Sequence, residues 1–117
     1  MAVSLAILLK PKINLKNINK LSTPKGRFEK IQVFNNKYCI IDYAHTPSAI
    51  ETVLKDIKKN FTGSIISIFG CGGNRDKGKR SKMGKIVEKF SDEILITTDN
   101  PRFEDPIDIY KDCLLYT

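Results

Sequence analysis

The segment FGCGGNRDKGKR, residues Phe69–Arg80, combines glycines with cations as anion-binding loops do. From Gly73 it has four residues followed by a Gly–Lys pair, which nearly reproduces the phosphate-binding P-loop. A P-loop continues with Ser or Thr, whose hydroxyl holds magnesium, whereas Arg80 stands here. A dinucleotide-binding fingerprint would require glycine at the position of Arg75. The segment therefore fits neither nucleotide motif.

What remains is a turn between a predicted strand and a predicted helix. Its glycines at positions 70, 72 and 73 would give the backbone conformational freedom. It carries the cations Arg75, Lys77, Lys79 and Arg80. A basic helix N-terminus suits an anion, and arginine pairs with a carboxylate or phosphate through two parallel hydrogen bonds. The alternative is a basic turn that is only solvated.

A second group of polar residues lies in DYAHTP. Asp42 ends a predicted strand, where a carboxylate can accept hydrogen bonds from ribose hydroxyls. His45 precedes a predicted helix and is suited to contact a phosphate or a base. The alternative for this histidine is a local cap or a packed ring.

A third group, DNPR, follows the next predicted strand. Asp99 and Asn100 offer acceptors for an amine, and Arg102 offers a guanidinium for a carboxylate. Together they have the chemistry to bind a zwitterionic amino acid. The alternative is an ordinary Asx–Pro turn.

Apolar periodicity predicts the elements that position these groups. Helices are expected over residues 2–10 and 14–21, and a hairpin at 30–34 and 38–42. Further helices are expected from Pro47, with Thr46 as N-cap, around Met83–Phe90, and over Ile107–Leu115. Between them, residues 64–69 and 93–98 are apolar runs typical of parallel strands.

The α, β, α, β, α order after Pro47 predicts a three-layer α/β domain with a parallel sheet. In such sheets ligands bind at the carboxyl ends of strands, where the Gly-rich and DNPR loops would lie. Two strands are few for a complete sheet, so we expect a fragment, with a domain boundary near Asp42–Pro47.

The composition restricts the class of protein. The 117 residues carry 20 basic and 13 acidic side chains, a net charge of +7 that favours acidic small-molecule partners. The lysines are scattered without interleaved aromatics, so no nucleic-acid partner is expected. No apolar run is long enough to span a membrane, and no membrane partner is expected. Three cysteines and a single histidine predict free thiols in a reducing cytoplasm and no metal site.

The motifs GRFE, DYAHTP, FGCGGNRDKGKR, MG and TTDNPRFEDP, in this order, closely resemble the Mur ligases. The resemblance covers nearly the whole chain and is strongest to the members that add meso-diaminopimelate. It implies three domains, of which residues 1–42 would end the central ATPase domain. Residues 43–117 would begin a Rossmann-like C-terminal domain, the amino-acid-binding one, left incomplete here.

The resemblance implies a reaction in cell-wall peptidoglycan synthesis, and thus in cell shape and division. ATP, with Mg²⁺ held by upstream residues, would phosphorylate the glutamate carboxylate of UDP-MurNAc-L-Ala-D-Glu. The amine of diaminopimelate would then attack the acyl phosphate. By resemblance, the cofactor-binding residues would be Arg27 on an ATP phosphate, Asp42 on the ribose and His45 in the same site.

Also by resemblance, the substrate-binding residues would be Arg75, Asp99, Asn100 and Arg102. Arg75 would meet one carboxylate of diaminopimelate. Arg102 would pair with the carboxylate that distinguishes it from lysine. The full-length enzyme would be a cytoplasmic monomer.

The chain departs from the family pattern because the P-loop, the magnesium ligands, the UDP-sugar domain and the end of the diaminopimelate pocket are missing from it. We therefore expect no catalytic residue and no catalysis by this chain alone. Two alternatives remain, a fragment of a folylpolyglutamate-synthase-like ligase and a non-catalytic anion-binding remnant.

Overall fold

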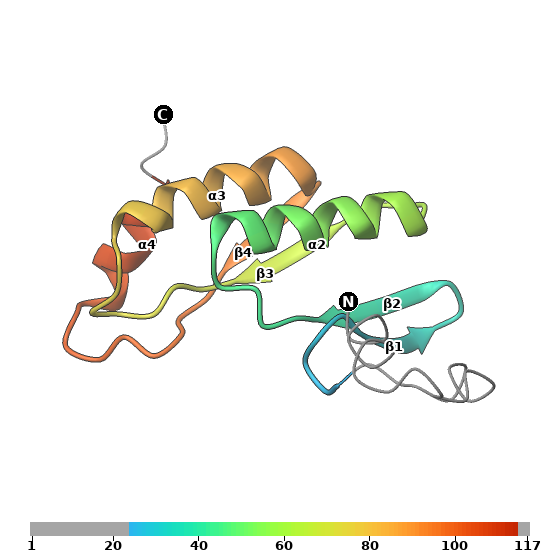
Figure 1. The fold of residues 1–117 in the computed structure, drawn as a ribbon, viewed down its shortest axis with the longest axis horizontal. Helices are drawn as coiled ribbons and strands as arrows, with labels where there is room; N and C mark the ends of the chain where they lie inside the picture. The colour runs from blue at the N-terminus through green and yellow to red at the C-terminus, as the bar shows by residue number, and fades with distance from the viewer. Residues whose placement is uncertain (1–23, 115–117) are drawn as a thin grey trace, which may run out of the picture. The chain divides into compact units, whose positions relative to one another are not determined.

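The computed structural model describes residues 24–114, so the helices predicted over 2–10 and 14–21 lie outside the described residues (Figure 1). The chain divides into two compact units, Met1–Ile41 and Asp42–Thr117. No helix within 24–114 is both long and apolar enough to cross a membrane.

The first unit contains the predicted hairpin. Strand β1 (Glu29–Phe34) pairs antiparallel with β2 (Lys37–Ile41), in a register that sets Ile31 opposite Cys39. Asn36 turns the chain with φ 61°, a left-handed conformation that asparagine tolerates better than most residues. The NNK turn and the hairpin are thus confirmed.

The second unit alternates as the sequence predicted. Helix α2 (Pro47–Asn60) is followed by β3 (Ile66–Phe69), α3 (Gly78–Phe90), β4 (Glu93–Ile96) and α4 (Pro106–Leu114). Thr46 Oγ1 accepts the Ala49 amide at 3.3 Å and Pro47 occupies the first turn, which confirms the predicted helix start. Strands β3 and β4 pair in parallel, also as predicted.

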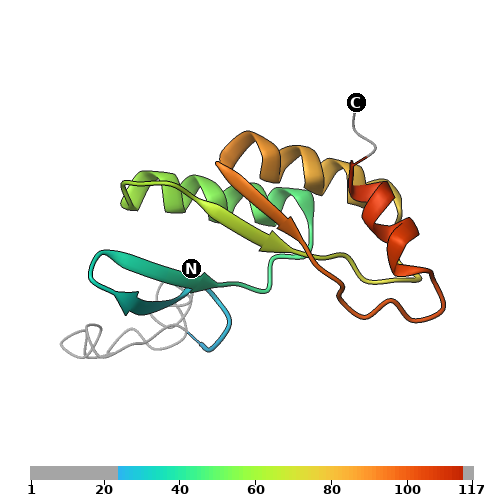
Figure 2. The same cartoon turned by 180° about the vertical axis from the view of Figure 1, so that it is seen from behind.

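Helices α2 and α3 cover one face of the β3–β4 pair, and α4 packs against α3 (Figures 1 and 2). Apolar side chains from both strands, among them Phe69, Ile94 and Ile96, pack against the buried core between these elements. The core consists of Ile50, Leu54, Cys71, Met83, Val87, Ile109 and Cys113.

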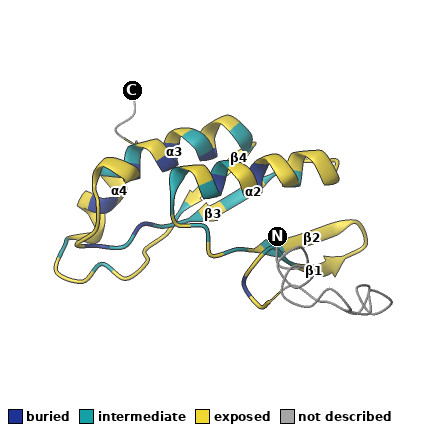
Figure 3. Cartoon of the chain, in the orientation of Figure 1, coloured by how far each residue is buried: buried dark blue, intermediate teal, exposed yellow. Residues whose placement is uncertain are grey.

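On the opposite face of the sheet, strand residues are exposed (Figure 3). Ile66, Ile68 and Leu95 are 57%, 67% and 55% exposed, because strand side chains alternate between faces and no described element of the second unit packs on this one. Within residues 42–114 the structure therefore shows two of the three predicted layers, the sheet and the helices on one of its faces. The apolar runs had suggested burial on both faces.

Candidate functional site

The loops that follow β3 and β4 lie against each other at the carboxyl ends of the strands. The Gly73 amide donates to the Asn100 carbonyl at 2.8 Å. A Cβ on Gly73 would lie 1.8 Å from the carbonyl oxygen of Pro101, and one on Gly70 would lie 2.5 Å from that of Thr97. Glycine is required here by close backbone approach.

This finding corrects the expected role of the glycines. The glycines of the described chain with positive φ are Gly26 and Gly63, so residues 70, 72 and 73 do not use a left-handed conformation. Gly70 and Gly73 are needed because they let the two loops touch, and not because they give the backbone conformational freedom. The prediction that the Gly-rich and DNPR loops share one edge of the sheet is confirmed.

Arg80 lies inside the protein, which corrects its place among the anion-binding cations. It is 1% exposed, and its guanidinium contacts both oxygens of Glu104 at 2.9 Å and Asp112 Oδ2 at 2.8 Å. Its Nη2 also donates to the Gly72 carbonyl at 3.2 Å, while Nε is buried without a hydrogen-bond partner. The guanidinium is therefore occupied by the protein's own groups.

The acidic partners of Arg80 were missed by the sequence reasoning, although one signal was available. Arg80 shares the buried face of α3 with Met83, Gly84 and Val87, at helical spacing. A cation on such a face requires a buried counter-charge. The sequence offers many carboxylates, and only the folded chain shows that Glu104 supplies one of them.

Arg80 and Glu104 each stabilise the charged form of the other. Hydrogen bonds from Arg80, and then from the Asn74 amide, lower the pKa of Glu104 to about 2. Hydrogen bonds to Glu104, and secondarily to Asp112, raise the pKa of Arg80 above its usual range. Both side chains remain charged at all physiological pH values, so this is a permanent cross-link between α3 and the loop after β4.

Arg75 and Asp99 are exposed, and neither side chain has a hydrogen-bond or ion-pair partner among residues 24–114. They come from the two touching loops, one a cation and the other an anion. Asp99 also lines a cavity of about 160 Å³, whose wall is formed mainly by α4 and the loop that precedes it. This edge therefore presents unpaired charges of both signs to solvent.

Asn100 and Arg102 are held by the loops themselves. The Arg102 amide donates to Asn100 Oδ1 at 3.2 Å, and the residue has φ 52°. One nitrogen of its guanidinium donates to the Gly73 carbonyl. Because guanidinium has five N–H groups, Arg102 retains donors for a carboxylate while its position is set by the backbone.

The lysines of the Gly-rich turn contact acidic neighbours. Lys77 Nζ lies 3.3 Å from Glu104, and Lys79 Nζ lies 3.8 Å from Asp76. Asp76 Oδ1 also accepts the amide of Gly78 at 3.0 Å, at the start of α3. Of the four predicted cations in this turn, Arg75 is the one without such a contact in the described chain.

The DYAHTP residues shape the entry to α2. Asp42 Oδ1 accepts the Ala44 amide at 2.8 Å, and His45 Nδ1 lies 3.0 Å from the Tyr43 carbonyl. A carbonyl can only accept, so Nδ1 of His45 is the donor in this contact. Arg27 is exposed and belongs to the other compact unit.

Two of the three cysteine thiols, those of Cys71 and Cys113, contact each other in the core. The Sγ atoms of Cys71 and Cys113 lie 3.6 Å apart in the core, whereas Cys39 is exposed. The hydrogen bond with Cys113 lowers the pKa of Cys71, and that contact together with burial raises the pKa of Cys113. Cys71 thus packs in the core. Residues 24–114 contain no cluster of three His, Cys, Asp or Glu side chains placed to hold a metal.

Comparison with known proteins places these features in a family. Residues 26–116 match the family described as Mur ligase, glutamate ligase domain. The UDP-N-acetylmuramoyl-L-alanyl-D-glutamate–2,6-diaminopimelate ligase of Prochlorococcus marinus subsp. pastoris is 48% identical over 96% of this chain and 24% of its own length. The Aquifex aeolicus ligase of the same name is 53% identical over 76% of this chain and 18% of its own length.

Solved structures agree with this assignment. A structure of a UDP-N-acetylmuramoyl-L-alanyl-D-glutamate–2,6-diaminopimelate ligase matches with a TM-score of 0.74 and 33% identity, over 97% of this chain and 24% of that one. A folylpolyglutamate synthase from Thermotoga maritima shares the fold, with a TM-score of 0.68 and 23% identity over 98% of this chain and 28% of that one. The chain spans about a quarter of the length of the first relatives. It belongs to the Mur ligase family, in the glutamate ligase domain.

Proposed function

We propose that this chain is the amino-acid-binding part of an ATP-dependent ligase that joins meso-diaminopimelate to UDP-MurNAc-L-Ala-D-Glu in peptidoglycan synthesis. The observation that carries the proposal is the edge where the Gly-rich and DNPR loops meet. It exposes unpaired Arg75 and Asp99 beside Asn100 and the partly occupied guanidinium of Arg102. Relatives similar in sequence are named as diaminopimelate ligases.

The charges at this edge match the chemistry of the substrate. Diaminopimelate differs from lysine by one carboxylate, so a site that selects it needs an additional cation. Arg75 and Arg102 would each bind a carboxylate, and Asp99 with Asn100 would orient an ammonium group. A site with two arginines would disfavour lysine because one guanidinium would remain unpaired.

ATP would be bound mainly by residues outside this chain. Its role would be to supply the phosphoryl group that activates the glutamate carboxylate. In this chain, Arg27 would contact a phosphate, Asp42 the ribose and His45 the same nucleotide. The exposed position and single backbone contact of His45 leave its Nε2 available for such a contact. We place the Mg²⁺ ligands upstream.

The domain assignment belongs to the same proposal. Residues 1–42 would close the central domain and 43–117 would begin the C-terminal one, supported by the division of the chain between Ile41 and Asp42. The family match itself begins at residue 26, within the first of these segments. The complete enzyme would act as a cytoplasmic monomer.

A chimaeric ligase tests the proposal. The segment of the Prochlorococcus marinus ligase that aligns with this chain is replaced by this chain, and phosphate release is measured with meso-diaminopimelate, lysine or glutamate as the amino acid. We expect activity with diaminopimelate, and a loss of about a hundredfold in kcat/KM for Arg102→Ala. Preference for glutamate would favour the folylpolyglutamate-synthase-like alternative. Absence of activity with all three would favour the non-catalytic remnant.

A further inference from the structure

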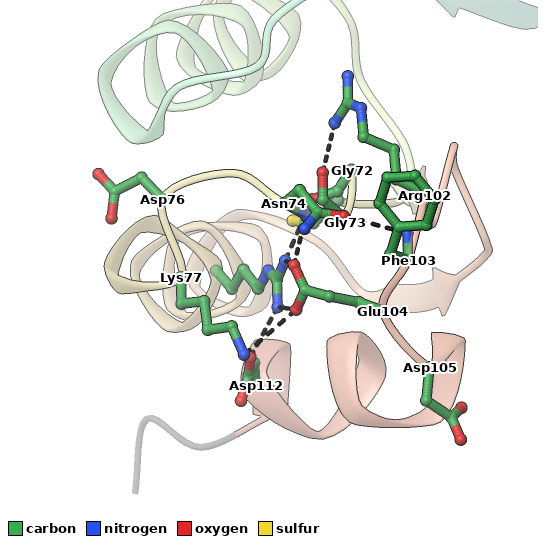
Figure 4. Close-up of polar contacts among 12 residues, drawn as sticks. Gly72, Gly73, Asn74, Asp76, Lys77, Arg102, Phe103, Glu104, Asp105 and Asp112 are labelled. Carbon is green, nitrogen blue, oxygen red and sulfur yellow. Dashed lines mark hydrogen bonds and ion pairs between the residues drawn. The ribbon is translucent and has the colours of Figure 1, made fainter.

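Glu104 is the point at which the two loops and helix α3 are joined (Figure 4). Its oxygens accept from both terminal nitrogens of Arg80 at 2.9 Å, and Oε1 also accepts the Asn74 amide. Lys77 Nζ lies 3.3 Å from Oε2. One side chain thereby contacts residues immediately before and shortly after Arg75.

Asn74 is held by the loop that follows β4 through both its backbone amide and its side chain. Its amide donates to Glu104, and its side-chain Oδ1 accepts the Phe103 amide at 3.1 Å. Asn74 has φ 52°, a left-handed conformation that asparagine tolerates better than most residues, and the two contacts with this loop hold it there. The backbone of the residue next to Arg75 is therefore set by contacts with the loop that carries Arg102.

Arg80 extends this restraint to Gly72, whose carbonyl it binds at 3.2 Å. The side chain of Arg75 makes no contact of its own in the described residues, so its location depends on the backbone on either side. The guanidiniums of Arg75 and Arg102 must be correctly spaced to bind two carboxylates of one small molecule.

We infer that Glu104, acting through Arg80 and the Asn74 amide, is a positioning residue that sets the spacing between Arg75 and Arg102 and thereby the selection of a dicarboxylic diamino acid. This inference rests on the proposed function and names the residue that determines its specificity. Glu104 does not touch the substrate; it fixes the loop from which Arg75 projects.

Asp112 provides a matched control. It also pairs with Arg80, at 2.8 Å, but it lies on α4, and among residues 24–114 its carboxylate bonds to Arg80 alone. Glu104→Ala and Asp112→Ala each remove one carboxylate from the same guanidinium. Only the first also removes the acceptor of the Asn74 amide.

The test uses the chimaeric ligase with these two variants and Glu104→Gln, which keeps an oxygen for the Asn74 amide. We expect Glu104→Ala to raise KM for diaminopimelate at least about tenfold with a much smaller change in kcat, and to narrow the preference over lysine. Asp112→Ala should stay within about twofold, and Glu104→Gln should recover most of the loss. Equal KM changes in the two alanine variants, or an unchanged KM in Glu104→Ala, would overturn the inference.

Hydrogen exchange of residues 70–80 in the same chimaeras, without substrate, gives a readout independent of activity. Glu104→Ala should accelerate exchange in this loop at least about tenfold more than Asp112→Ala. Equal acceleration would refute the positioning role even in an active enzyme. A chimaera that uses another amino acid, yet shows the expected exchange, would refute the proposed substrate and leave the loop restraint standing.

Discussion

Gly73→Ala tests whether the two loops must touch. The added Cβ would lie 1.8 Å from the Pro101 carbonyl oxygen, a backbone atom that cannot rotate away. Restoring an ordinary contact of 3.4 Å requires the loops to separate by about 1.6 Å. That movement would break the 2.8 Å hydrogen bond from the Gly73 amide to Asn100 and the bond from Arg102 to the Gly73 carbonyl.

The two lost hydrogen bonds are each worth about 1 kcal/mol, so the free energy of unfolding should fall by about 2 kcal/mol. With a urea dependence of about 1 kcal/mol per molar, the unfolding midpoint of the chain should drop by about 2 M. Urea unfolding followed by the circular dichroism of the helices measures this shift.

Gly78→Ala is the matched control. It lies in the first turn of α3, where the nearest atom to a Cβ is the flexible Asp76 carboxylate at 3.2 Å. Alanine is the better helix former by up to about 1 kcal/mol, so the midpoint should stay constant or rise. Equal midpoints for the two variants would refute the reasoning that close approach, and not local flexibility, demands glycine at position 73.

Four further outcomes follow from the buried charges, the thiols and the missing nucleotide motif. Arg80→Met should lower the free energy of unfolding by about 3 kcal/mol, because it removes the buried guanidinium that pairs with both Glu104 and Asp112; a change below about 1 kcal/mol in urea unfolding would contradict the burial. The pKa of Glu104 is lowered to about 2 from 4.5, so its contribution to stability is complete above 4.5 and disappears as the pH falls from there to about 2. Acid unfolding should lose that component in Glu104→Gln, and an unchanged acid profile would count against the pairing. A thiol reagent should label Cys39 rapidly in the native chain and Cys71 and Cys113 only after unfolding, so rapid labelling of all three would show that the core is open. Calorimetry of the isolated chain with Mg-ATP should show no micromolar binding, and heat of binding at that level would disprove the reading of the Gly-rich segment.

Much of the local structure was accessible from the sequence because short-range rules govern it. Thr46 and Pro47 mark a helix start, and apolar periodicity after them produces α2. The alternation of elements predicts parallel pairing, which in turn brings the Gly-rich and DNPR loops to one edge. The sequence thus suggested Asp99, Asn100 and Arg102 as an amino-acid site, whereas the role of Arg75 came from the family resemblance.

Three features could not be obtained this way. The glycines at 70 and 73 were assigned flexibility, since sequence shows the absence of a side chain but not the backbone that fills its place. The open face of the sheet, with Ile66 and Ile68 exposed, contradicts what apolar runs suggest on their own. Arg80 was counted as a ligand group because charge is visible in a sequence and burial is not.

The sequence alone thus determined the family, the order of the elements and the loops that carry chemistry, because motifs and periodicity are local properties of the chain. Tertiary structure decided which charged side chains are available to bind a ligand. Arg80 is taken by Glu104 and Asp112, while Arg75 stays unpaired in the described residues. The physical reason is that a charge becomes a structural or a binding group according to its neighbours in space, and Glu104 lies 24 residues from Arg80 along the chain.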